Sequence, residues 1–262
     1  MHNKTVNEFF IRNDINEEEI VRSLDTKILS IGEIDPLMED FCIYKSPIIA
    51  KISISDIYGF DYGWRGIYPN IFRALDSFFD ESSNGYKSRS CHNLLRTSDE
   101  MLSSDSFIKE PMQVVEVDEL NKIYLIGNNG LHRYSSLRVL YLNELYHHPD
   151  REKELKEKYK VLVSLSKIDQ VKTYCNFIIS SNIGDSYIKR ELDHNYRPTG
   201  NAVLVTGDNR KIVLTDEELL DYTRNIVINN PNFIEEHNTN SNFQRFVEDV
   251  LYNDKNMGGY NG

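Results

Sequence analysis

The strongest constraint on the fold is the segment 111–146, in which a strand-like hydrophobic pattern changes to a helix-like one across a short loop. Residues 112–117 and 123–126 are mostly apolar and rich in β-branched side chains, which predicts two strands joined by a tight turn. From residue 131 to 145 the apolar residues recur at helical spacing. We therefore predict a strand, a turn, a second strand, a loop and an amphipathic helix.

The loop between the second strand and the helix carries the residues with the clearest chemistry. Glycines at its two ends let the backbone turn sharply and approach a ligand closely. The first amides of the helix have no acceptor within the helix, and the positive end of the helix dipole favours an anion. The sequence therefore predicts a phosphate-binding loop, made of Gly127, Asn128, Asn129, Gly130, Leu131, His132 and Arg133.

Two side chains of this loop suit a polyphosphate. Arg133 carries a permanent charge and can make a two-pronged contact with phosphate oxygens. His132 can donate a hydrogen bond or relay a proton near neutral pH. The spacing alone leaves a second interpretation open, in which the segment is a glycine-bounded turn with Arg133 in solvent and His132 in a structural role.

Residues 123–142, IYLIGNNGLHRYSSLRVLYL, resemble the strand, Gly-x-His-Arg loop and helix of the ParB/sulfiredoxin superfamily. Residues 51–58 and 110–117 are similar to the two strands that precede this motif in the family, so the resemblance covers roughly 50–170. It implies that the loop holds nucleotide phosphates, with Gly130, His132 and Arg133 at the matching positions. It also implies a nucleoside triphosphate such as ATP or CTP, together with Mg²⁺, as the cofactor.

The chain differs from sulfiredoxins at Leu131, and this difference argues against sulfiredoxin activity. Sulfiredoxins have a cysteine where this chain has Leu131, and leucine offers no thiolate. Reduction of a cysteine sulfinic acid by that mechanism is therefore not expected. Some members use a carboxylate beside the loop as a base in phosphoryl transfer, and Glu110 stands where such a residue would. The alternative interpretation of Glu110 is an ordinary solvated acid before a proline.

These observations lead to two functional hypotheses. In the first, the protein binds a nucleotide and hydrolyses it or transfers a phosphoryl group to an unidentified acceptor, with His132, Arg133 and Glu110 as catalytic residues. In the second, it is a nucleic-acid-directed module of the partitioning, DNA-modification or toxin-like kind, without small-molecule catalysis. A scaffold that has lost its ligands is a third hypothesis.

Composition bears on these hypotheses. The net charge of −11 argues against a broad electrostatic grip on nucleic acid, which needs many basic contacts to phosphates. No stretch approaches the roughly 20 apolar residues that a transmembrane helix needs, so we expect a cytoplasmic protein with no membrane partner. Cys42, Cys91 and Cys175 are well separated and lack CxxC spacing, so we expect reduced, buried thiols and no cysteine-based metal site.

We predict an α/β (α+β) protein with a small mixed sheet and flanking helices. Its expected parts are an N-terminal helical extension (1–46), a nucleotide-binding core (47–182) and a C-terminal hairpin and helices (183–262). Further elements are expected as helices over 17–28, 69–80, 94–102, 150–158, 171–180, 216–229 and 243–252, as strands over 47–56 and 160–165, and as a hairpin over 202–206 and 211–214.

Two other groups of residues are weaker candidates for a site. Trp64 and Arg65 lie in a glycine-rich segment, where they can flank a nucleobase or, alternatively, anchor the loop to the core. The stretch 193–197 concentrates titratable groups, namely Asp193, His194, Tyr196 and Arg197, and one hypothesis is that it folds over the phosphate loop and closes the site.

Overall fold

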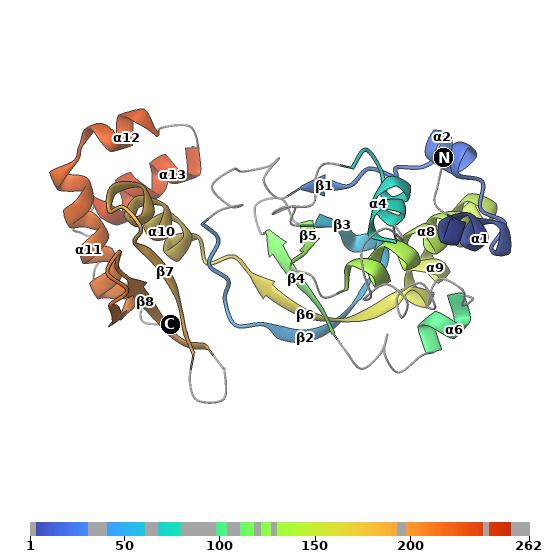
Figure 1. The fold of residues 1–262 in the computed structure, drawn as a ribbon, viewed down its shortest axis with the longest axis horizontal. Coiled ribbons are helices and arrows are strands. Elements are labelled where there is room, and N and C mark those ends of the chain that lie inside the picture. Colours follow the sequence, from blue (N-terminus) through green and yellow to red (C-terminus); the bar gives the residue numbers. More distant parts are fainter. Residues whose placement is uncertain are drawn as a thin grey trace. The chain divides into compact units, whose positions relative to one another are not determined.

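The structure, a computed structural model, describes residues 4–30, 41–60, 68–79, 98–103, 111–117, 122–126, 130–192, 198–237 and 241–252. The chain divides into two compact units (Figure 1). The first joins Met1–Ile34 to Pro47–Ser166, and the second joins Asp35–Ser46 to Lys167–Gly262.

This division differs from the expected one in three places. Residues 1–34 lie in the same unit as the sheet instead of forming a separate extension. The segment 35–46 groups with the C-terminal part of the chain, and so does the helix at 170–182 that was assigned to the core. The physical reason is burial: Tyr174, Cys175 and Phe177 on that helix pack in a hydrophobic cluster with residues of the C-terminal helices. Local periodicity shows that such a helix is amphipathic, but not which core it joins.

The first unit contains the following elements in chain order: α1 (Lys4–Arg12), α2 (Glu17–Ser23), β1 (Leu29–Ser30), β2 (Ile48–Ser53), the 3₁₀ helix η1 (Ile54–Asp56), β3 (Ile57–Phe60), α4 (Ile71–Phe78), α6 (Ser98–Ser103), β4 (Met112–Val117), β5 (Lys122–Leu125), α8 (Leu131–His147), the 3₁₀ helix η3 (Pro149–Arg151), α9 (Glu152–Lys158) and β6 (Lys160–Lys167).

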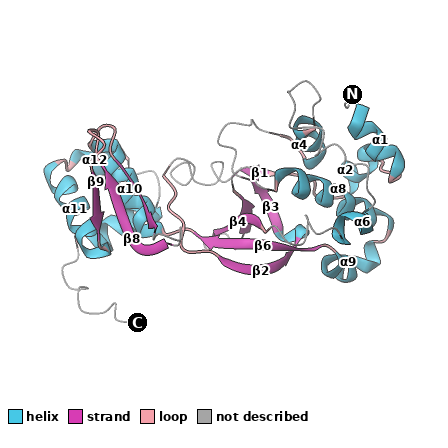
Figure 2. Cartoon of the chain, turned by 60° about the horizontal axis from the view of Figure 1, so that its bottom comes forward, coloured by secondary structure: helices cyan, strands magenta, loops and turns pink. Residues whose placement is uncertain are grey.

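The strands, drawn in magenta in Figure 2, form one mixed sheet. Their order is β1-β3-β5-β4-β6-β2. Strand β3 pairs in parallel with both β1 and β5. Strand β4 is antiparallel to β5, and β2 is antiparallel to β6. A mixed sheet with flanking helices is the predicted fold class, which the structure confirms. The hairpin register places Val114 opposite Leu125, as the two apolar runs require.

The predicted strand over 47–56 is shorter than expected. Strand β2 ends at Ser53, whose hydroxyl accepts a hydrogen bond from the amide of Ser55 and begins the 3₁₀ turn η1. Ile54, fully buried, donates its amide to the carbonyl of Tyr159 at 3.0 Å. The predicted segment 47–56 therefore contains one strand and a turn, because a tertiary hydrogen bond and serine capping outweigh the local strand preference.

The core of the first unit lies between the sheet and the helices α1, α4 and α8, which lie together in Figure 1. Helix α4 begins after Asn70, whose side chain accepts a hydrogen bond from the amide of Arg73. It buries five of its eight residues, which confirms the predicted helix at this position. Helix α1 adds Val6, Phe9 and Phe10 to the same core, so the N-terminal helices pack against the sheet unit.

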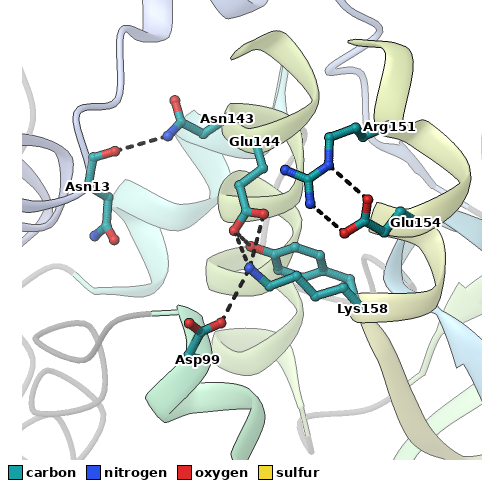
Figure 3. A network of polar contacts seen from close by, with 8 residues as sticks. Asn13, Asp99, Asn143, Glu144, Arg151, Glu154 and Lys158 are labelled. Atoms are coloured by element: carbon teal, nitrogen blue, oxygen red, sulfur yellow. Dashed lines mark hydrogen bonds and ion pairs between the residues drawn. The ribbon is translucent and has the colours of Figure 1, made fainter. Parts of the chain in front are cut away.

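A polar network ties the C-terminal half of α8 to neighbouring helices (Figure 3). The Glu144 carboxylate accepts hydrogen bonds from Lys158 Nζ at 2.8 Å and from the Tyr159 hydroxyl at 2.6 Å. Lys158 also lies 3.3 Å from Asp99 on α6. The Asn143 amide donates to the main-chain oxygen of Asn13 at 2.9 Å. These contacts hold the C-terminal half of α8 in place.

The second unit is built from a helix, an antiparallel sheet and further helices. In chain order its elements are α10 (Gln170–Asn182), β7 (Tyr187–Leu192), β8 (Pro198–Val205), β9 (Lys211–Leu214), α11 (Asp216–Asn229), α12 (Asn232–Glu236), α13 (Ser241–Phe246) and the π-helical turn η4 (Val247–Leu251). The sheet order is β7-β8-β9, and α10 and α11 pack against it.

Two predictions in the second unit are confirmed, and two elements, β7 and α12, were missed. The hairpin of β8 and β9 and the capping box of Thr215 and Glu218 ahead of α11 are both present. Strand β7 was not predicted, because its sequence YIKREL is largely polar. It forms through pairing with β8, in which Ile188 faces Leu204 and both side chains are buried. Pairing with a neighbour outweighs weak local propensity here.

Candidate phosphate-binding site

The candidate site is the N-terminus of α8, and the preceding hairpin positions it. At the end of β5, the amide of Ile126 donates to the carbonyl of Gln113 at 2.9 Å, beside the start of β4. The chain returns at Gly130, which lies against Met112, the first residue of β4. Both ends of the predicted loop therefore lie beside the same end of the hairpin.

Gly130 has the backbone geometry that the predicted loop requires. It adopts φ 111° and ψ −6°, a left-handed conformation that residues other than glycine rarely adopt. A Cβ atom at this position would lie 2.7 Å from Cγ of Met112. Both the torsion angle and the close approach therefore demand glycine, and the prediction that the backbone turns sharply here is confirmed.

Among the described residues, no side chain caps the start of α8. Gly130 occupies the N-cap position and has no side chain to accept a hydrogen bond from the first turn. The intrahelical hydrogen bonds begin with the amide of Tyr134, which donates to the carbonyl of Gly130 at 2.7 Å. The amides of Leu131, His132 and Arg133 consequently have no acceptor inside the helix, and they are the groups that an anion at this end would contact.

The side chain of His132 lies against the end of α4. Its Nε2 is 3.0 Å from the main-chain oxygen of Phe78, and its ring meets the Phe79 ring edge-on at a centroid distance of 4.8 Å. Because a carbonyl oxygen can only accept, Nε2 carries the proton in this contact. In the neutral ring Nδ1 is then the accepting nitrogen. His132 is thus a half-buried residue with a defined orientation.

The other described residues of the first turn differ in how far their side chains are buried. The side chain of Leu131 is buried, at 2% exposure, so its amide is the group that can contact a ligand. Arg133 is half-buried on the same first turn. Tyr134 anchors this turn to the sheet, because its hydroxyl donates to the carbonyl of Ile57 at 3.0 Å. The first turn of α8 is therefore fixed to both α4 and β3.

Several predicted site residues lie outside the described residues. They include Gly127, Asn128, Asn129 and Glu110, as well as Trp64, Arg65 and the stretch 193–197. The structure therefore brings together Gly130, Leu131, His132 and Arg133, and the other assignments stay predictions. Phe78 and Phe79, which orient His132, were not recognised as part of this region. They lie 54 and 53 residues earlier in the chain, so no local motif links them to the loop.

Among the residues that the structure describes, no cluster of three or more histidine, cysteine or acidic side chains is arranged to hold a metal ion. Over the same part of the chain, no helix is both long and apolar enough to cross a bilayer. Comparisons with known proteins give no match to a protein family, to a curated protein or to a solved structure.

Proposed function

We propose that the protein binds the phosphates of a nucleoside triphosphate, such as ATP or CTP, at the N-terminus of α8. The observation that carries the proposal is the left-handed Gly130 at the start of this helix, whose positive φ and close approach to Met112 strongly disfavour any residue with a Cβ atom. Three successive amides without acceptors in the helix, at the positive end of the dipole, favour an anion. The resemblance of residues 123–142 to the ParB/sulfiredoxin loop supports the same ligand.

The proposed chemistry is hydrolysis of the nucleotide or transfer of a phosphoryl group. Arg133 and the amides of the first turn would stabilise charge that develops on the phosphate oxygens. Mg²⁺ would be held mainly by the nucleotide's own phosphates, as is usual for this ion. Glu110 remains the proposed base. The contact of Nε2 with Phe78 supports a narrower part for His132 than the sequence suggested: it orients the turn, and only Nδ1 is suited to accept a proton.

Nucleotide titration tests this proposal. ATP, ADP, CTP and GTP are titrated with and without Mg²⁺ into the wild-type chain, Arg133→Ala and the control Arg22→Ala. Arg22 is 77% exposed and pairs with Glu18 on α2, so its loss removes a surface charge away from α8. We expect Arg133→Ala to weaken binding about tenfold or more, since a charge-assisted hydrogen bond contributes roughly 1.5–3 kcal/mol. Arg22→Ala should bind like wild type.

The outcomes separate binding from catalysis. If wild type binds no nucleotide, the proposal fails. If binding survives Arg133→Ala unchanged, the site lies elsewhere. Release of inorganic phosphate from a bound nucleotide would support hydrolysis, whereas tight binding of DNA or RNA without nucleotide turnover would favour the nucleic-acid-directed alternative.

A further inference from the structure

The second unit contains a small cavity lined by more basic than acidic residues. Its volume is about 160 Å³, room for several water molecules or one small ligand. It is lined by Tyr44, Lys45, Ser46, Asp169, Lys172, Arg190 and Asn201. Three of these residues are basic and one is acidic. All of them belong to the second unit, so the cavity is independent of α8.

Hydrogen bonds between distant segments build this cavity. The segment around Tyr44 pairs with the chain before α10 through a bridge between Tyr44 and Ile168. The amide of Lys45 donates to the carbonyl of Lys167 at 2.8 Å, and the amide of Asp169 donates to the carbonyl of Ile43 at 2.8 Å. These bonds fix one wall against the N-terminus of α10, and β7 and β8 provide the other wall.

The strongest evidence for an anion site in this cavity is the environment of Arg190. Its guanidinium is half-buried, and it donates from Nη1 to the main-chain oxygen of Lys45 at 3.1 Å. Among the described residues no carboxylate lies within ion-pair distance of this guanidinium. Burial lowers the pKa of Arg190, whereas the nearby Tyr44 acts in the opposite direction. A half-buried guanidinium with no acidic partner in the described part of the chain is stabilised by an anion that supplies one.

The other charged residues that line the cavity differ from Arg190 in their partners. The buried Lys172 already has two acidic partners, Asp216 at 2.9 Å and Asp169 at 3.5 Å. Asp169 also accepts a hydrogen bond from the amide of Lys172 as the N-cap of α10. Lys45 is exposed, and within the described part of the chain it has no carboxylate in contact. Arg190 and Lys45 are thus the two cations available to an incoming anion.

We propose that this cavity binds a small oxyanion of the phosphate type, with Arg190 as its principal contact and Lys45 as its second. A guanidinium matches two phosphate oxygens at once, and the lysine ammonium adds a second charge. Tyr44 and Ser46 also line the cavity, and a hydroxyl group can donate a hydrogen bond to a phosphate oxygen. The volume suits inorganic phosphate or the phosphate end of a small monoester, and it is too small for a whole nucleotide.

Isothermal titration of the full chain with inorganic phosphate tests this proposal, with chloride holding the ionic strength constant. The variants are Arg190→Gln, Lys45→Gln and the matched control Arg210→Gln. Arg210 is 76% exposed and pairs with Asp208 in the turn between β8 and β9 of the same unit. We expect Arg190→Gln to weaken phosphate binding about tenfold or more, Lys45→Gln to weaken it severalfold, and Arg210→Gln to leave it unchanged.

Parallel titrations identify the ligand and the site. Acetate should bind more weakly than phosphate, and equal binding would overturn the assignment to a phosphate-type anion. Arg133→Ala should leave phosphate binding to this cavity intact; loss of binding in that variant but not in Arg190→Gln would overturn the proposal in favour of α8. Absence of saturable binding to wild type would also overturn it. Lys45 is exposed, so Lys45→Gln keeps the test valid even if Arg190→Gln does not fold.

Discussion

His132 donates a hydrogen bond from Nε2 to the main-chain oxygen of Phe78, 3.0 Å away, and so joins the first turn of α8 to the last residue of α4. The contact closes the C-terminal end of α4, where carbonyl oxygens lack donor partners within the helix. His132 of the predicted phosphate loop therefore contributes to the stability of the fold, and this contribution can be measured without a ligand.

Replacing His132 by alanine should destabilise the protein. The substitution removes the hydrogen bond to Phe78 and the edge contact with Phe79, together about 1–3 kcal/mol. The midpoint of urea denaturation should fall accordingly. His148→Ala is the matched control, because His148 is exposed at the end of α8, and it should change stability by less than about 0.5 kcal/mol. Equal midpoints for wild type and His132→Ala would show that the contact adds nothing.

Gly130→Ala should destabilise the protein through two separable effects. A Cβ atom at this position is strained at φ 111° and lies 2.7 Å from Cγ of Met112. Together these effects should cost about 2 kcal/mol or more, measured by urea denaturation.

A double-mutant cycle with Met112→Ala separates the two effects. Met112→Ala alone should be costly, since Met112 is buried, but it removes Cγ and Sδ and leaves only the Met112 Cβ, 3.1 Å from the new Cβ. In that background Gly130→Ala should cost mainly the torsional strain, about 1–2 kcal/mol. An unchanged cost in both backgrounds would mean that close packing against Met112 does not constrain this position.

Glu144→Ala should destabilise the junction of α8 and α9 more than Glu144→Gln does. Alanine leaves the Tyr159 hydroxyl and the Lys158 ammonium without their shared acceptor, whereas glutamine still accepts one hydrogen bond. We expect a loss of about 2 kcal/mol for alanine and about 1 kcal/mol for glutamine in urea denaturation. Glu152→Gln is the control: its ion pair with Lys156 is solvent-exposed and should contribute less than about 0.5 kcal/mol.

The same junction has a defined pH dependence. Desolvation opposes the charge on Lys158, but the contacts with Glu144 and Asp99 outweigh it and raise the pKa of Lys158. A raised folded-state pKa contributes stability that is present below the lysine's unfolded value and is lost as the pH rises through the folded value. The stability difference between wild type and Lys158→Met should therefore shrink in strongly alkaline solution. A difference independent of pH would contradict this.

The Cys175 thiol should be unreactive in the folded protein. Burial raises the pKa of Cys175 to about 12, although a hydrogen bond with Thr223 acts in the opposite direction. At pH 8 the folded thiol is therefore almost entirely protonated and should not react with a disulfide reagent such as Ellman's reagent. Cys42 is only half-buried, contrary to the expectation of a buried thiol, so it must be removed from the assay. A Cys42→Ser/Cys91→Ser variant isolates Cys175, and full reaction should appear only in urea.

The sign of the thiol's effect on stability follows from the same shift. Above the unfolded-state pKa of about 8.5 the unfolded thiol ionises while the folded one does not, so this residue lowers the folding stability progressively up to about pH 12. Rapid modification of native Cys175 at pH 8 would show that the thiol is accessible and contradict its burial.

Local sequence determined most elements around the candidate site. The strand β4, the helix α8 and the sharp turn at Gly130 were all predicted, because each depends on properties of neighbouring residues: periodicity for the strand and helix, and backbone freedom for the glycine. The Thr215–Glu218 capping box was found for the same reason, since its two partners are three residues apart.

Only the tertiary structure shows the contacts between residues that are distant in sequence. The orientation of His132 depends on Phe78 and Phe79, strand β7 depends on pairing with β8, and the cavity at Arg190 joins segments 145 residues apart through its bond to Lys45. In each case the stabilising contact forms only when the chain has folded, because its energy comes from partners distant in sequence. The residue types of this protein thus determine its local conformations, whereas long-range packing determines which distant residues come into contact.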